Sequence, residues 1–215
     1  MGDASLGILV AAVLVGYLVG SASPAALVAR ARGVDLRTSG SGNPGATNAG
    51  RVMGRPIGYL VGVADVLKGL LPALGFGLWG GPVPAMVAGL SAVVGHVTSP
   101  WLRGHGGKGV ATSFGAILGV APVWGGLGLL VFAVVVLLTR WVALGSVTAA
   151  VMVAVLAVVA WLAPSGWVAA EAGSWGTAAP PEGLRVAWAA ALALIVIGRH
   201  RRNLVARIRR RRSPA

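Results

Sequence analysis

The chain has 215 residues, of which 56% are hydrophobic and only 11% are charged, and its mean hydropathy is +0.83. A soluble domain usually carries about a quarter charged residues, so this composition excludes an ordinary soluble protein and predicts an integral membrane protein. The sequence has no cysteine, which excludes both disulfides and thiolate chemistry.

Apolar segments recur along the chain and predict an all-α membrane protein with seven transmembrane helices, its N-terminus outside and its C-terminus cytoplasmic. The uncharged run from Gly109 to Thr139 would be about 46 Å long as one helix, which is long for one span and short for two. We expect a split near Ala121-Pro122, because one span would send the Arg-rich tail outside. Two short helices then imply tilt, local thinning of the bilayer or burial within the bundle. The predicted spans are residues 4–29, 56–76, 83–97, 109–121, 122–139, 142–163 and 184–198.

The net charge of +13 comes from cations that fall in loops on one side of this topology. That distribution follows the positive-inside rule and orients the protein. We expect a single membrane domain over residues 1–215 with a basic cytoplasmic tail at about 204–215, which would attract anionic lipid rather than nucleic acid. The cytoplasmic cations before the tail are Arg30, Arg32, Arg37, Arg51, Arg55, Arg103, Lys108 and Arg140.

A polar, glycine-dense stretch, Ser39–Arg51, lies between two apolar runs. Glycines allow backbone N–H groups to turn inward, and Arg37 and Arg51 flank the stretch with fixed positive charge. Successive N–H donors beside guanidinium groups make a phosphate-binding loop the favoured interpretation, and a flexible connector is the alternative. The candidate ligands within it are Ser41, Gly42, Asn43, Gly45, Thr47 and Asn48.

Asp65 and Lys68 are ionisable residues inside the second apolar segment. Such residues are costly in a membrane and are candidates for function by default. The two lie three residues apart on one helix face and could pair. Lys68 is therefore a candidate substrate ligand, and the alternative is a neutralised structural pair near the cytoplasmic end.

A second glycine-rich turn runs into a predicted helix start and contains Gly107 and Lys108. Free N–H groups at a helix start attract anions, and Lys108 adds a mobile cation. This is not a nucleotide-hydrolysing Walker A loop, because Gly109 follows the lysine where Ser or Thr is required. Thr112 and His96 flank the turn as further candidate ligands, although His96 could equally cap the preceding helix.

Two further polar clusters adjoin helix ends on the same side. Arg140 and Ser146 lie between the fifth and sixth predicted spans, where Arg140 could also be an orientation charge. His200 and Asn203 follow the last span and are three apart, so they could face the loops together, unless the segment is only a basic cluster at the membrane surface.

All these clusters fall on the cytoplasmic side of the predicted topology. They combine donors and cations with almost no carboxylates, so the favoured ligand is anionic, with two phosphate groups. The sequence shows no cluster of metal ligands, and we expect neither a metal nor a cofactor.

The ordered set of motifs strongly resembles the acyl-phosphate:glycerol-3-phosphate acyltransferase family of the PlsY type, from about Gly20 to Asn203. The motifs that carry the resemblance are Ser41-Gly-Asn-Pro-Gly-Ala-Thr-Asn48 with Arg51, Asp65-Val-Leu-Lys-Gly69, Gly95-His96, Gly106-Gly-Lys-Gly-Val-Ala-Thr112, Thr139-Arg140 and His200 with Asn203. The resemblance implies a bacterial inner-membrane enzyme that transfers a fatty acyl group from acyl phosphate to the 1-hydroxyl of glycerol 3-phosphate. It would release lysophosphatidic acid and phosphate at the entry to phospholipid biosynthesis.

The resemblance also implies roles for individual residues. Ser41, Lys108, His200 and Asn203 match catalytic positions and Arg51 matches a phosphate-binding position, with Asn43, Thr47 and Asn48 lining the loop. The expected partners are glycerol 3-phosphate, acyl phosphate and membrane lipid, with no nucleic acid, and a monomer is the expected state. Two departures stand out: Gly20-Ser-Ala-Ser-Pro24 replaces a shorter Gly-Ser-x-Pro motif, and Arg202 stands where the family commonly has Glu.

A transporter or channel for an organic phosphate is the rival function. Transporters usually bind near the membrane midplane and need polar groups that are reachable from both sides. The outer half of this chain is nearly bare of charge, which favours the enzyme.

Overall fold

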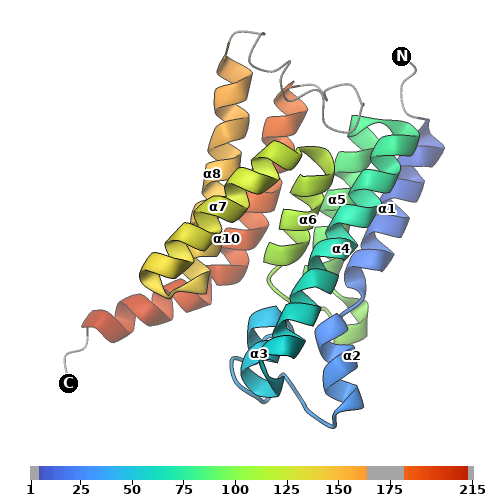
Figure 1. The fold of residues 1–215 in the computed structure, drawn as a ribbon. Helices are drawn as coiled ribbons and strands as arrows, with labels where there is room; N and C mark the ends of the chain where they lie inside the picture. Colours follow the sequence, from blue (N-terminus) through green and yellow to red (C-terminus); the bar gives the residue numbers. More distant parts are fainter. Residues whose placement is uncertain (1–4, 164–181, 213–215) are drawn as a thin grey trace.

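The computed structural model describes residues 5–163 and 182–212, and every regular element within these ranges is helical. The long helices run up and down one axis and form a bundle (Figure 1). The helices are α1 Leu6–Ser21, α2 Pro24–Ala31, α3 Ala46–Met53, α4 Arg55–Gly80, α5 Pro82–Val97, the 3₁₀ turn η1 Pro100–Leu102, α6 Val110–Val120, α7 Pro122–Thr139, α8 Val142–Leu162 and α10 Glu182–Arg212.

Within the described residues, six helical stretches are long and apolar enough to cross a membrane, which confirms the prediction of an all-α, multi-pass membrane protein. The predicted break in the long apolar run is also present, because α6 ends at Val120 and α7 begins at Pro122. With 11 residues, α6 rises only about 16 Å against a hydrocarbon core of about 30 Å, so it can serve as the seventh predicted crossing only where neighbouring helices shield it. Seven crossings and the orientation of the termini stay predictions.

Burial within the bundle accounts for the short length of α6. Its residues Thr112, Gly115, Ala116 and Gly119 are buried, and the helix packs against α4 and α5. At Gly69 of α4 an added Cβ would collide with the Thr112 carbonyl oxygen, so the two backbones touch. Tilt and bilayer thinning are therefore not needed to explain why this segment is short.

The first apolar run is not one helix, which corrects the prediction for residues 4–29. It breaks after Ser21, and α2 starts at Pro24 with Ser23 as its N-cap, whose hydroxyl accepts a hydrogen bond from the Ala26 N–H at 3.3 Å. Proline suits the first turn of a new helix and cannot donate to the preceding one. The break leaves the Ala22 carbonyl without a helical partner, and this group becomes important below.

The polar stretch Ser39–Arg51 is also only partly a loop, because α3 begins at Ala46. One face of α3 is apolar, and Ala49 is fully buried against Ala25, Leu36 and Val61. The prediction of a loop was wrong from residue 46 onward. Glycine and asparagine are typical of loops, and here they occur in a short amphipathic helix that buries its apolar side.

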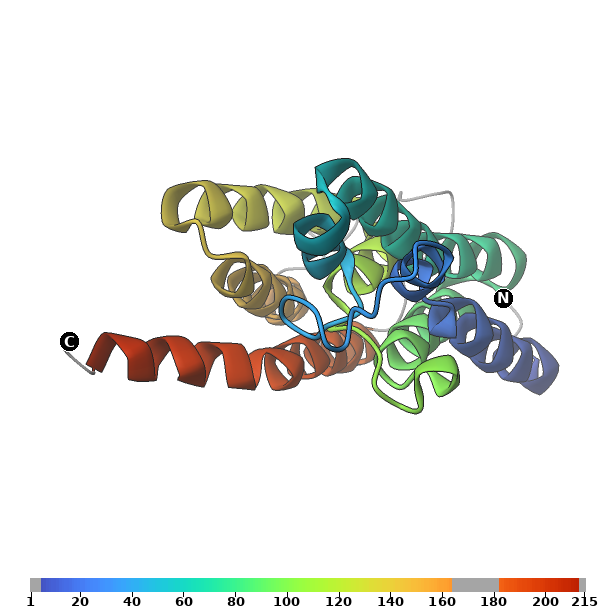
Figure 2. The same cartoon turned by 90° about the horizontal axis from the view of Figure 1, so that it is seen from below.

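The helices form two groups. Helices α1, α4, α5 and α6 pack together, and α7, α8 and α10 form the second group, as the view from below shows (Figure 2). A hydrophobic cluster that includes Met86 of α5, Ile117 of α6 and Trp188 of α10 joins the groups. The Trp188 indole also donates to the Met86 carbonyl at 2.8 Å. Both residues lie near the starts of their helices, so this hydrogen bond is at the end where α5 and α10 begin, and the cluster continues along both helices to Val93 and Leu192.

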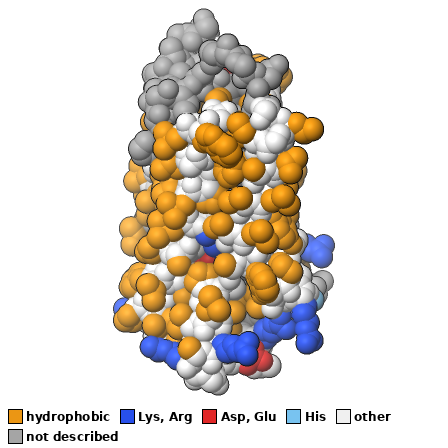
Figure 3. Space-filling view, turned by 90° about the vertical axis from the view of Figure 1, so that its right-hand side faces the viewer, with side chains coloured by type: hydrophobic (Ala, Val, Ile, Leu, Met, Phe, Trp, Pro, Cys, Tyr) orange, Lys and Arg blue, Asp and Glu red, His pale blue; other side chains and the backbone are white. Residues whose placement is uncertain are grey.

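Charge gathers at the opposite end, which we call the basic end: the connections from α2 to α4, from α5 to α6 and from α7 to α8, and the C-terminal part of α10. The middle of the surface is hydrophobic, and blue side chains lie at this lower end in Figure 3. The described cations there are Arg30, Arg32, Arg37, Arg51, Arg55, Arg103, Lys108, Arg140, Arg199 and Arg201.

Candidate active site

The first glycine-rich loop is held in shape by Asn48 of α3. The Asn48 side chain is 1% exposed, and its Oδ1 accepts from the Ser41 N–H at 2.8 Å. Its amide nitrogen donates to the carbonyls of Leu36 and Ser39 at 3.3 and 3.0 Å. All of these bonds join residues within twelve positions of each other. The side chain predicted to bind substrate is thus already occupied in fixing the loop.

Other donors of this loop are also used internally. The Gly42 N–H donates to the Ser39 carbonyl, and the Gly45 N–H to the Asn43 carbonyl. The predicted cradle of free backbone N–H groups is therefore not what these positions offer. The loop instead presents side chains: Ser41 and Thr47 are exposed, and Asn43 is half-buried.

The second glycine-rich segment, residues 98–109, connects α5 to α6, and we call it the strap. Its start is tied to the α1–α2 break, because the Ser99 hydroxyl donates to the Ser21 carbonyl at 2.6 Å and the Trp101 indole to the Ser21 hydroxyl at 2.9 Å. Its middle is tied to the first loop, because the Arg37 guanidinium donates to the Leu102 carbonyl at 2.7 Å. The serine whose role the family motif left open, Ser21, therefore anchors the strap.

The end of the strap lies between α5 and α10. The Gly106 and Gly107 N–H groups donate to the carbonyls of Val97 and His96, each at 3.2 Å. An added Cβ at Gly107 would collide with Nε2 of His96. The His96 side chain thus packs directly against Gly107 of the strap. The Gly107 N–H, predicted to face an anion, bonds the His96 carbonyl instead.

Lys108 is the cation that the strap carries. It is half-buried beside Arg51 and Arg199. Burial first, and then the positive charges of Arg199 and Arg51, lower the pKa of Lys108 below its ordinary value of 10.5. The charges of Arg51 and Arg199 act on Lys108 together, and an anion bound beside them would offset their mutual repulsion.

α10 brings His200 to the same place. This histidine is 2% exposed, and its Nδ1 lies 2.8 Å from the Val196 carbonyl. Because a carbonyl only accepts, Nδ1 carries the proton and Nε2 is left to exchange one. Lys108 is near enough for its charge to act on His200. Asn203, one turn further along, is exposed.

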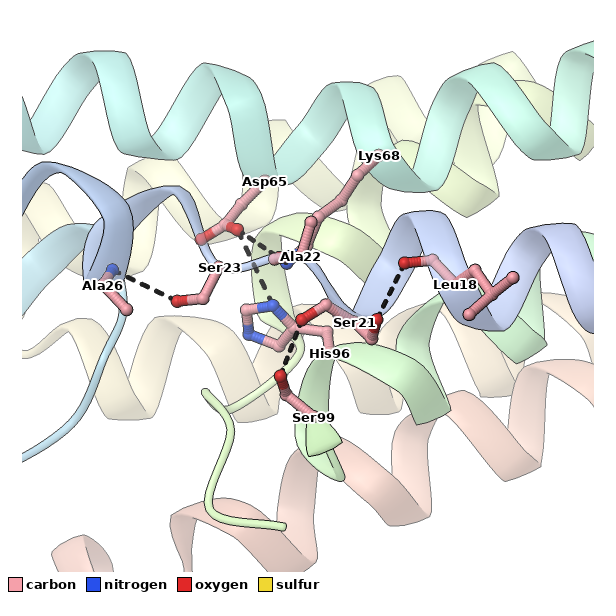
Figure 4. A network of polar contacts seen from close by, with 9 residues as sticks. All are labelled: Leu18, Ser21, Ala22, Ser23, Ala26, Asp65, Lys68, His96 and Ser99. Atoms are coloured by element: carbon pink, nitrogen blue, oxygen red, sulfur yellow. Dashed lines mark hydrogen bonds and ion pairs between the residues drawn. The ribbon is translucent and has the colours of Figure 1, made fainter. Parts of the chain in front are cut away.

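Asp65, Lys68 and His96 form a separate buried network at the α1–α2 break, where they point toward one another (Figure 4). Lys68 Nζ lies 3.0 Å from Asp65 Oδ1 and donates to the Ala22 carbonyl at 2.7 Å. His96 Nδ1 lies 3.6 Å from the same Asp65 oxygen. The pairing predicted from the spacing of Asp65 and Lys68 is confirmed. Lys68 does not reach toward the membrane surface, because it satisfies the carbonyl that the helix break exposes.

The remaining predicted ligands are spread more widely. Thr112 is fully buried in the first turn of α6, and its hydroxyl has no hydrogen-bond partner among the described residues. Ser146 is buried in α8 and donates to the Val142 carbonyl in its own helix. Arg140 is exposed in the α7–α8 turn, which lies apart from the strap in both ribbon views (Figures 1 and 2). The structure thus brings Arg51, Lys108 and His200 together and leaves Arg140 and Ser146 apart.

The bonds that two arginines make in the site were not predicted from the sequence. Arg199 donates from Nε to the Gly107 carbonyl at 3.2 Å and from Nη2 to the Gly106 carbonyl at 2.7 Å. Arg37 bonds the strap rather than a ligand. The sequence predicts Arg37 only as a flanking charge of the first loop and does not single out Arg199, and their partners lie 65 to 93 positions away, so no local pattern could identify these bonds. No group of three or more residues suited to a metal occurs in the described part of the chain.

Comparisons with known proteins agree on one family. The model of the glycerol-3-phosphate acyltransferase family matches residues 10–210. A glycerol-3-phosphate acyltransferase of Geobacter sulfurreducens is 48% identical over 139 residues, 63% of this chain and 71% of the relative. One from Geotalea daltonii is 35% identical over 189 residues, 87% and 88% of the two chains.

The fold is similar to two solved structures of PlsY (YgiH), an integral membrane glycerol 3-phosphate acyltransferase. The glycerol 3-phosphate form matches with a TM-score of 0.80 and 32% identity, covering 96% of this chain and 95% of that one. The lysophosphatidic acid form matches with a TM-score of 0.78 and 31% identity, covering 94% and 93%.

Proposed function

The chain belongs to the glycerol-3-phosphate acyltransferase family and is a membrane acyltransferase, and from this premise we propose the reaction and its residues. A fatty acyl group passes from acyl phosphate to the 1-hydroxyl of glycerol 3-phosphate, giving lysophosphatidic acid and inorganic phosphate in the first step of phospholipid biosynthesis. The observation that carries the proposal is the contact between the strap and α10 at the basic end, where Arg199, next to His200, bonds Gly106 and Gly107, next to Lys108.

The phosphate of glycerol 3-phosphate binds Arg51, Lys108 and His200. This assignment rests on charge: Arg51 offers a fixed planar fork, Lys108 a mobile ammonium, and His200 an N–H at Nε2 once the ring has taken up a second proton. The acyl phosphate places its head group against the Ser41 loop, where Asn43 and Thr47 offer side-chain hydrogen bonds, and its chain among the helices. Thr112 is a further candidate ligand, because its buried hydroxyl is unpartnered in the described structure.

The chemistry is acyl transfer between two oxygens. The 1-hydroxyl oxygen attacks the carbonyl carbon, a new C–O bond forms, and the bond to the phosphate oxygen breaks. Cations and hydroxyl donors stabilise the charge that develops on the carbonyl oxygen and on the departing phosphate, and binding both substrates supplies proximity. The hydroxyl proton passes to the departing phosphate or to His200 Nε2. Acyl phosphate is an activated mixed anhydride, so the reaction needs no strong base.

We place the protein in the bacterial inner membrane as a single domain over residues 1–215, with seven crossings, the N-terminus outside and the basic end in the cytoplasm. The support is the concentration of described Lys and Arg at one end, as the positive-inside rule requires. Because the chain has no native cysteine, a single Ser41→Cys can be labelled cleanly. An impermeant thiol reagent should label it only from the cytoplasmic side, and labelling from outside would invert the topology.

The activity itself is tested with purified protein, a long-chain acyl phosphate and glycerol 3-phosphate. Phosphate release and lysophosphatidic acid formation should appear together and only when both substrates are present. An organic-phosphate transporter would instead carry glycerol 3-phosphate into vesicles without consuming acyl phosphate. No product from intact acyl phosphate would overturn the proposed reaction.

A further inference from the structure

The two halves of the candidate active site belong to different groups of helices. Arg51, the first loop and the strap with Lys108 are attached to α1, α4, α5 and α6, whereas His200 lies on α10 of the second group. The hydrophobic cluster that joins the groups includes Val93 of α5 and Trp188 and Leu192 of α10, and it contains neither Lys108 nor His200. The spacing between Lys108 and His200 therefore needs a connection at the basic end.

Arg199 makes such a connection. Its Nε and Nη2 donate to the carbonyls of Gly107 and Gly106 at 3.2 and 2.7 Å. Lys108 directly follows Gly107 in the sequence, and His200 directly follows Arg199, so this contact lies beside both candidate site residues. A guanidinium can hold two carbonyls at once in a fixed plane, which the single ammonium of a lysine cannot do with the same geometry. The clamp thus fixes both the position and the orientation of the peptide that precedes Lys108.

The strap cannot shift away from this clamp without cost on its other side. The Gly106 and Gly107 N–H groups bond the end of α5 while their carbonyls bond Arg199. A Cβ at Gly106 would collide with the His96 carbonyl oxygen, so the strap lies directly on α5. The backbone is held from both sides at the two residues before Lys108.

We propose that Arg199 is a positioning residue for acyl transfer, whose clamp on Gly106 and Gly107 holds Lys108 at its working distance from His200. The inference rests on the proposed function for its catalytic consequence. Its structural part, the coupling of the strap to α10, is testable without any activity.

The structural part is tested by double electron–electron resonance with spin labels at His105→Cys in the strap and Val205→Cys on α10, both of which are exposed. The parent protein should give a narrow distance distribution. Arg199→Gln should broaden it. Arg201→Gln is the matched control, because Arg201 is an exposed arginine on the same helix, and it should leave the distribution unchanged. Identical distance distributions in the parent and in Arg199→Gln would overturn the proposed coupling of the strap to α10. This result would hold whatever reaction the protein catalyses.

The catalytic part is tested in the phosphate-release assay. Arg199→Gln should lower kcat by about 100-fold and raise KM for glycerol 3-phosphate, since a misplacement of about 1 Å can cost that much. Arg199→Lys should recover only part of the loss, and Arg201→Gln should match the parent. A merely structural role would instead reduce the fraction of active enzyme and leave the KM of the surviving enzyme unchanged.

A double-mutant cycle shows whether Arg199 acts through Lys108. If it does, Arg199→Gln should lower the residual rate of Lys108→Ala by less than about twofold, because the group that it positions is gone. Equal losses in the parent and in Lys108→Ala would contradict the proposal. An inactive parent with a narrow, Arg199-dependent distance distribution would reject the proposed function and keep the clamp.

Discussion

The two glycine-rich segments at the basic end are held in opposite ways. The first loop is fixed locally, by an asparagine at most twelve positions from its partners. The strap is bonded to the end of α5 through Gly106 and Gly107, and it is also held by Ser21, Arg37 and Arg199, which are 65 to 93 positions away from the strap residues that they bond. The first loop can therefore keep its shape as a unit of α3, whereas the strap has its shape only when α1, α5 and α10 are all in place.

This difference predicts how each segment responds to change. A substitution in the strap disturbs contacts to several helices and displaces Lys108. A substitution in the first loop should stay local. Variants of the strap should therefore lose more activity than variants that loosen the first loop.

The largest effect is expected for Lys108→Ala. Removal of one preorganised cation or donor from a site of charge development typically costs about 100- to 1,000-fold in kcat. The helical content and the melting temperature should be unchanged, because Lys108 makes no described hydrogen bond that the fold depends on. Parent rates of phosphate release in this variant would remove Lys108 from the active site.

Gly107→Ala should come next, with a loss of about 100-fold from a shift of the strap. The added Cβ meets the His96 ring, which is packed on Asp65 and cannot easily move away. Gly75→Ala is the matched control, because a Cβ there meets nothing within 4 Å. Similar rates for the two variants would contradict a tightly held strap.

Asn48→Ala should have a smaller effect. It leaves the Ser41 N–H and two carbonyls without their partner, which costs about 1–3 kcal/mol of stability for a buried group. We expect a lower melting temperature and a loss of activity near tenfold. Asn48→Asp keeps one acceptor but turns a second oxygen toward the Leu36 and Ser39 carbonyls, so its melting temperature should be no higher than that of Asn48→Ala. If Asn48→Ala lost more activity than Gly107→Ala, the claim that the strap is the more sensitive of the two segments would be wrong.

The protonation of Lys108 affects the rate mainly at high pH. Its pKa lies below 10.5, so the lysine loses its charge at a lower pH than an exposed lysine would. In the free enzyme kcat/KM should therefore fall above this lowered pKa, by tenfold per pH unit. Lys108→Arg keeps its charge throughout, so its pH profile should lack this fall. The same alkaline fall in Lys108→Arg would assign it to another group.

The smallest effect is expected for Arg140→Gln. Arg140 is exposed in a turn apart from the strap, and exposed substitutions usually change free energies by no more than about 0.5 kcal/mol, or about twofold in rate. A loss of tenfold or more would place this turn in the site after all.

The sequence predicted those features that depend on neighbouring residues. Apolar runs without charge locate the long helices, Pro122 marks the break before α7, and a spacing of three predicts the Asp65–Lys68 pair. Two local signals were hidden. The break after Ser21 lies in a run that is apolar on both sides, and α3 is concealed by glycine and asparagine residues that are typical of loops.

Long-range contacts could not be predicted from the sequence in the same way. Nothing near Arg199 indicates that it bonds Gly106 and Gly107, because the partners come together only when both helix groups have packed. The backbone N–H groups of Gly42, Gly45 and Gly107 show a different limit, because their partners lie only two to eleven positions away. Their composition predicts anion donors, but the fold supplies each of them with a carbonyl partner.

The most direct test of the account is whether glycerol 3-phosphate occupies one site that both helix groups share. Single cysteines at Ser41 and at Asn203 lie on exposed positions of the first loop and of α10, and Arg32→Cys on the C-cap of α2 serves as a control. We predict that glycerol 3-phosphate slows thiol labelling at 41 and at 203 with the same half-maximal concentration and leaves position 32 unaffected. Protection at only one of the two positions, or at two clearly different concentrations, would contradict a single shared site.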